Sequence, residues 1–197
     1  MRAPGSRRCR RWARLLMGLA SGVLWAPGAS AQVFMTQDEA LALAFPDAEI
    51  ERHTAFLTEA EVARAGETAG SDVEVRQSVV PYYLARRGEA YVGVAYFDAH
   101  RVRTKEEVLM IVIGPDDRIR RIEVLKFAEP PDYLAPEGWI EQLEGRALDR
   151  DLSLRGGIIG MAGATLTARA MVDAARRVLA LHSVVRPFEG AGAALRP

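Results

Sequence analysis

Near the C-terminal end of the chain, small residues and a threonine hydroxyl lead directly into a helical pattern. Gly163 and Ala164 precede Thr165, and the apolar residues after it recur at helical spacing. Backbone N–H groups at a helix start have no partner within the helix and lie at the positive end of its dipole, so they suit a phosphate. The small side chains leave room for a bulky phosphorylated ligand. The alternative is a helix capped by a threonine behind a glycine turn.

The same run resembles the flavinylation motif of the FMN-binding domain family, whose pattern is roughly Asp-Gly-x-Ser/Thr-Gly-Ala-Thr. Gly160, Gly163, Ala164 and Thr165 match this pattern. In that family a flavin transferase attaches FMN through its phosphate to the hydroxyl of the last threonine. The chain departs from the pattern at two positions, which bear on recognition by the transferase. Ile159 stands where the family has aspartate, and residue 162 is alanine where the family has serine or threonine.

Two upstream segments are similar to the same family. Residues 129–134 resemble the loop that faces the isoalloxazine ring, and residues 138–146 resemble the tryptophan helix that precedes the flavinylation loop. The resemblance covers most of residues 73–182. Family members include the G subunit of the Rnf electron-transport complex and the C subunit of the sodium-pumping NADH:quinone reductase. The resemblance therefore implies FMN as the cofactor and electron transfer as the activity.

The resemblance also implies roles for single residues. Thr165 is the expected attachment point, and the amides of Leu166 and Thr167 would donate to the phosphate. Thr167 is the alternative attachment hydroxyl or an ordinary first-turn threonine. Trp139 either packs on the flavin ring or belongs to the core. Arg155 either neutralises the phosphate or is a solvated loop residue. The expected FMN-binding residues are Thr165, Gly163, Ala164, Leu166, Thr167, Gly160, Trp139, and Glu129 and Tyr133 at the flavin edge.

The N-terminal residues predict export. Six arginines with no acidic residue precede an apolar stretch over 15–25, which is short for a membrane span. Ala29-Ser30-Ala31 follows as a small-x-small cleavage site. We therefore expect residues 1–31 to be a signal peptide and the mature protein to lie in the periplasm or at the outer face of the inner membrane. The alternative is an uncleaved anchor.

Composition excludes several classes of function. Residues 32–197 hold six more acidic than basic residues, which argues against nucleic acid as a partner. The one cysteine, Cys9, lies in the predicted signal peptide, so the mature chain has no thiol chemistry. The three histidines are widely spaced and predict no metal site. Residues 100–104 are expected to be an exposed basic loop; the alternative is an anion contact.

The order of patterns predicts an α+β domain with a twisted antiparallel sheet and packed helices. Capping boxes begin helices at Thr36 and Thr58, the second ending near Ala65 before a loop over 66–71. Strands are expected at 73–84, 90–97, 107–113 and 118–127, with the third covered on both faces. The last helix is expected over 166–182. The expected domains are a signal peptide (1–31), a helical and extended segment (32–72), an FMN-binding domain (73–185) and a flexible tail (186–197).

Three functions remain open on these residues. The first is an exported electron carrier with FMN on Thr165, matured by a flavin transferase and serving redox partner proteins that include a membrane reductase. Such a relay needs no catalytic base and no small-molecule substrate. The second is a flavin-free binding or scaffold module that accompanies a membrane reductase. The third is a flavin reductase with non-covalent FMN, although no dinucleotide-binding fingerprint is present.

Overall fold

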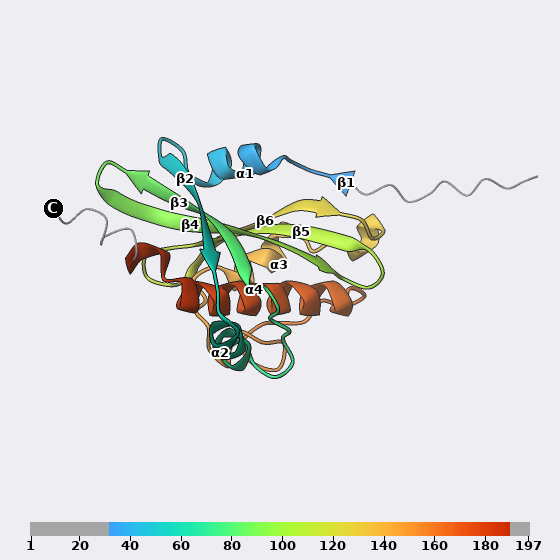
Figure 1. The fold of residues 1–197 in the computed structure, drawn as a ribbon. Helices are drawn as coiled ribbons and strands as arrows, with labels where there is room; N and C mark the ends of the chain where they lie inside the picture. Colours follow the sequence, from blue (N-terminus) through green and yellow to red (C-terminus); the bar gives the residue numbers. More distant parts are fainter. Residues whose placement is uncertain (1–31, 190–197) are drawn as a thin grey trace, which may run out of the picture.

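A six-stranded antiparallel sheet forms the centre of the fold (Figure 1). The structure is a computed structural model that describes residues 32–189, so the predicted signal peptide and the last eight residues of the predicted tail lie outside the described residues. The strand order is β1-β6-β5-β4-β3-β2. The strands are β1 (Gln32–Val33), β2 (Glu49–Phe56), β3 (Val79–Arg87), β4 (Ala90–Arg101), β5 (Glu106–Ile113) and β6 (Ile119–Phe127).

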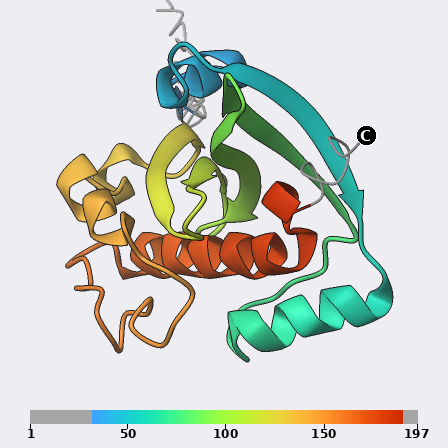
Figure 2. The same ribbon diagram turned by 90° about the vertical axis from the view of Figure 1, so that its left-hand side faces the viewer.

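Helices cover both faces of this sheet, which confirms the predicted α+β class. Figure 2 shows the long α4 and the shorter α2 on one side of the curved sheet and α1 on the other. No described helix is long and apolar enough to span a bilayer. The helices are α1 (Gln37–Ala44), α2 (Glu59–Ala69), η1 (Pro131–Tyr133), α3 (Glu137–Ile140), η2 (Glu141–Leu143) and α4 (Thr165–Val185).

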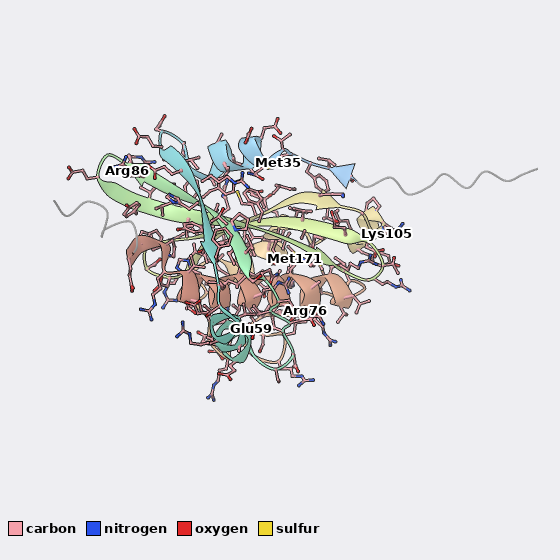
Figure 3. The ribbon with its side chains drawn as sticks, viewed as in Figure 1. Met35, Glu59, Arg76, Arg86, Lys105 and Met171 are labelled. Atoms are coloured by element: carbon pink, nitrogen blue, oxygen red, sulfur yellow. The ribbon has the colours of Figure 1, made fainter. Side chains whose placement is uncertain are left out.

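Two apolar cores lie on the two faces of the sheet. The larger core joins α4 to the sheet, and Met171 lies fully buried between them (Figure 3). The smaller core packs Leu41 and Phe45 at α1 against Met110 and Val112 of β5. Strand β5 therefore contributes to both cores, as its continuous apolar run predicts. This packing fixes α4 against the centre of the sheet and so places the start of α4.

Both capping boxes form as predicted. The hydroxyls of Thr36 and Thr58 accept from the amides of Glu39 and Glu61, and both glutamates accept in return from the cap amides. The second helix is longer than expected, however, and ends at Ala69 rather than Ala65. Its polar last turn stays helical because both alanines are fully buried, and α2 packs against α4.

One predicted strand begins later than its sequence pattern indicates. Strand β3 starts at Val79, whereas the pattern predicts a strand from residue 73. The partner strand decides this boundary, because Phe56 at the end of β2 pairs with Val79. The amide of Leu57 donates to the carbonyl of Ser78 at 2.7 Å just beyond that pair. Val73 is instead buried in the core beside the end of α2.

Candidate functional site

A pocket of about 290 Å³ lies at the start of α4. Three segments that are distant in sequence form its wall: the β4–β5 turn, the stretch after β6, and the residues that lead into α4. Seven of the nine residues expected to bind FMN line it together. The lining consists of Val102, Arg103, Glu129, Tyr133, Gly163, Ala164, Thr165, Leu166 and Thr167.

The backbone at the start of α4 is open to a ligand. Gly163 has a φ of 81°, a conformation that glycine adopts without strain. Ala164 is the N-cap, and no side chain caps the helix among the described residues. The first intrahelical bond runs from the amide of Ala168 to the carbonyl of Ala164 at 3.1 Å. The earlier amides of this turn are thus the donors that a helix start leaves without intrahelical partners.

The two threonines of this turn have different surroundings. Thr165 is exposed, and its hydroxyl makes only a long 3.4 Å bond to the carbonyl of Met161. Thr167 is 1% exposed, and its hydroxyl donates to the carbonyl of Tyr133 at 2.7 Å. The second hydroxyl therefore joins α4 to the segment that contains η1. Of the two, Thr165 is the one that a modifying enzyme can reach.

Glu129 fixes the turn that covers the pocket. Its Oε1 accepts from the backbone amides of Thr104 at 2.7 Å and Lys105 at 2.8 Å. These bonds hold the pKa of Glu129 below its usual value, the Thr104 amide having the largest effect. Figure 3 shows Lys105 at the far end of the β4–β5 hairpin. Glu129 thus lines the pocket and also positions its cover.

Arg103 is the cationic residue of the pocket, and it is not among the nine residues expected to bind FMN. It lies on the turn that Glu129 holds, opposite the start of α4, where its guanidinium suits a phosphate group. The alternative of an anion contact within residues 100–104 covers the segment that contains Arg103, and it stays a prediction. The sequence contains no local signal that separates Arg103 from neighbouring exposed arginines, because the pocket is assembled by distant segments.

Three other predicted residues lie outside the lining. Trp139 is 8% exposed in the larger core, and its indole N–H donates to the carbonyl of Ile159 at 2.7 Å. The burial of Trp139 places it in the core, and its hydrogen bond holds the loop before α4. Gly160 is exposed on the same loop, and no atom would crowd a side chain there. Arg155 lines a different pocket.

A buried network of charged side chains joins the β4–β5 hairpin to α4. Arg177 of α4 makes two bonds to Asp98 of β4, at 2.7 and 2.8 Å. His100 contacts Asp98 through Nδ1 and Glu107 through Nε2, both at 2.9 Å. His100 is largely buried, so the expectation of an exposed basic loop from residue 100 onward is wrong at its first residue. The strand register places His100 opposite Glu107.

The network shifts the pKa values of its members. Burial alone would favour neutral His100, but hydrogen bonds to Asp98 and Glu107 raise its pKa to about 9. Burial also acts against the charge of Asp98, yet the bonds from Arg177 and His100 hold its pKa below the usual value. Burial raises the pKa of Glu107, whose Oε1 has no hydrogen-bond partner among the described residues. The network therefore ties α4 to the hairpin through charges shielded from water.

Residues 32–189 contain no cluster of side chains suited to a metal ion.

Replacing Glu129 by glutamine is expected to loosen the turn over the pocket, because a neutral amide accepts more weakly than a carboxylate. We expect the free energy of unfolding to fall by about 1 kcal/mol and the amides of Thr104 and Lys105 to exchange faster with solvent. Urea unfolding and amide hydrogen exchange measure both effects. Glu89→Gln in the exposed β3–β4 turn is the matched control. Unchanged exchange at both amides would contradict the role of Glu129.

Part of the chain matches a known family of protein domains. Residues 104–180 match the sequence model of the FMN-binding domain. The matched range begins in the turn held by Glu129 and ends within α4, so it includes the loop before the helix and Thr165. No curated protein and no solved structure matches the chain.

Proposed function

The chain carries an FMN-binding domain at residues 104–180 and is a flavoprotein with FMN as its cofactor; from this premise we propose that FMN is attached to Thr165 and that the protein relays electrons outside the cytoplasm. The observation that supports the attachment is the exposed hydroxyl of Thr165 beside the free amides of the α4 start. The pocket around it contains the donors and the cation that a phosphate requires.

Attachment would form a phosphoester bond between Oγ1 of Thr165 and the phosphorus of FMN. An activated flavin nucleotide with a pyrophosphate bond supplies the FMN, its nucleoside monophosphate half leaves, and the hydroxyl loses its proton. The protein thus gains the mass of FMN less one water. Gly163 and Ala164 leave space for this exchange, since neither carries a side chain larger than a methyl group. A flavin transferase is the partner that this step requires.

The residues of the pocket have distinct tasks in this proposal. The amides of the first turn donate to the phosphate, and Arg103 offsets its charge. The bond from Thr167 to Tyr133 holds one wall, and Glu129 holds the turn opposite. Bound FMN supplies one- and two-electron chemistry. No residue of the pocket needs to act as a catalytic base for such a relay.

The predicted signal peptide supports a place in the periplasm or at the outer face of the inner membrane. A covalent bond keeps a small cofactor from being lost in that compartment and maintains its local concentration. The partners we propose are electron donors and acceptors, including a membrane reductase. The acidic balance of residues 32–197 fits protein partners better than nucleic acid.

A second candidate is a flavin reductase with non-covalent FMN, favoured by the departures from the flavinylation pattern at residues 159 and 162. The absorption spectrum before and after denaturation separates the two candidates. We expect the yellow flavin spectrum to stay with the unfolded chain after gel filtration in guanidinium. Flavin that elutes with the small molecules would instead support the second candidate. Protein that is colourless after production with a flavin transferase would contradict both.

Restoring the two departing residues is expected to speed attachment. Ile159 is 75% exposed, although its amide and carbonyl are held by Gln142 and Trp139. Ile159→Asp with Ala162→Ser should therefore change the unfolding free energy by no more than about 0.5 kcal/mol. With limiting transferase, we expect several-fold faster modification, followed by intact mass against time. The matched control is Leu43→Asp, an equally polar change at an exposed site on α1. An unchanged rate in the double variant would show that the transferase does not read these positions.

A further inference from the structure

A second and larger cavity, of about 610 Å³, lies between the end of α2, α4 and the loop over 150–155. We infer that this cavity binds a small organic anion that carries two or more carboxylate or phosphate groups. Its volume is within the range of small-molecule sites. It shares no lining residue with the pocket at Thr165. The inference therefore does not depend on where FMN is held.

Positive charge gathers in this cavity. Four arginines line it against two aspartates, although residues 32–197 as a whole hold more acidic than basic residues. The guanidinium groups of Arg150, Arg155 and Arg169 have no hydrogen bond or ion pair to any described residue. Each group is a planar fork of donors that matches carboxylate and phosphate oxygens. Cations without a hydrogen-bonded partner that line one concave surface attract an anion from solution.

The fourth arginine holds the walls of the cavity in place. Arg176 donates from Nε to the carbonyl of Ala69 at 2.7 Å, at the end of α2. Its Nη1 donates to the carbonyls of Asp149 at 2.7 Å and Leu152 at 2.9 Å. Gly70 follows with a φ of 103° and lies close to the same guanidinium. One side chain thus fastens α4 to both other walls, so the cavity is a fixed feature of the fold.

The two aspartates narrow the chemistry of the ligand. Asp173 is half-buried on α4, where burial raises the pKa of its carboxyl group, and Asp72 follows the end of α2. Carboxylates beside the arginines disfavour a bare inorganic anion and favour a ligand that also carries hydroxyl or amine donors. A phosphorylated metabolite and a hydroxylated polycarboxylate both meet this description. They share the multiple oxyanion groups that the arginines recognise.

The cavity begins one helical turn from the proposed cofactor attachment. Thr165, Arg169 and Arg176 are spaced four and seven residues apart, which places them along one face of α4. One turn of an α-helix advances about 5.4 Å. The cavity therefore begins on the same face of α4 as Thr165. The binding itself needs only the arginine-lined cavity.

Calorimetric titration of the purified protein with fructose 1,6-bisphosphate and with citrate, at constant ionic strength, tests the inference. We expect saturable binding of at least one anion with a stoichiometry near one. Binding of fructose 1,6-bisphosphate alone would identify a phosphate ligand, and binding of citrate alone would identify a carboxylate ligand. Arg155→Ala combined with Arg169→Ala should weaken binding about tenfold or more. Both side chains are exposed and make no hydrogen bond or ion pair to a described residue, so the variant is expected to fold normally.

Two controls isolate the cavity. Arg64→Ala removes an exposed arginine of α2 outside the cavity and should leave the affinity unchanged. Thr165→Ala should bind the anion as the parent protein does, so loss of covalent flavin and loss of this site are separate outcomes. Absence of saturable binding for both anions would overturn the inference. Equal affinity in the double arginine variant and the parent would do the same.

Discussion

Protein in which Thr165 is replaced by alanine is expected to show no gain of mass when it is produced with a flavin transferase. The parent should gain the mass of FMN less one water. The substitution removes the exposed hydroxyl of Thr165, whose oxygen would form the phosphoester bond. The side chain makes only a 3.4 Å bond to Met161, so the unfolding free energy should change by no more than about 0.5 kcal/mol. Intact mass spectrometry measures the result directly.

Three further variants serve as controls for this prediction. Thr165→Ser keeps a hydroxyl at the same position and should still be modified. Thr54→Ala removes an exposed threonine hydroxyl from the edge strand β2 and should be modified like the parent. Thr167→Ala removes the alternative hydroxyl, which is buried against Tyr133 in the structure. Full mass gain in the Thr165→Ala protein would overturn the proposed attachment, and loss of that gain on further replacement of Thr167 would move it there.

Replacing Asp98 by alanine is expected to lower the free energy of unfolding by about 3–5 kcal/mol. Asp98 is 5% exposed and accepts from both Arg177 and His100. Without it, Arg177 and His100 lose the carboxylate that both bind, and Glu107 remains as the hydrogen-bonded partner of His100 alone. Urea unfolding at neutral pH measures the change.

The dependence of this effect on pH distinguishes the ion pair from simple packing. The pKa of Asp98 is lowered on folding, so its contribution is fully present above the unfolded value of 3.8 and is lost as pH falls below it. The difference between parent and variant should therefore shrink in acid. Asp132→Ala, at an exposed aspartate of η1, is the matched control and should change stability little at any pH. A difference that stays constant through acid pH would argue for lost packing alone.

Local signals in the sequence were enough to predict many of the helices and strands. The capping boxes at Thr36 and Thr58 begin their helices as predicted, since each box is completed within four residues. The sequence patterns predict the wrong end for α2 and the wrong start for β3. Burial against α4 and pairing with β2 decide these two boundaries. Both errors lie where a distant partner overrides local composition.

The functional residues divide in the same way. Gly163, Ala164 and Thr165 are contiguous and precede an amphipathic helix. The sequence alone therefore determined where this helix starts and which family the segment resembles. The family match agrees with that resemblance. Only the tertiary structure decided that Arg103 and Glu129 share a pocket with that helix start. It also decided the network at Asp98 and the arginine-lined cavity, because their members come from segments far apart in the chain. The physical reason is that adjacency along the backbone specifies a turn or a cap, whereas a pocket depends on packing among distant segments.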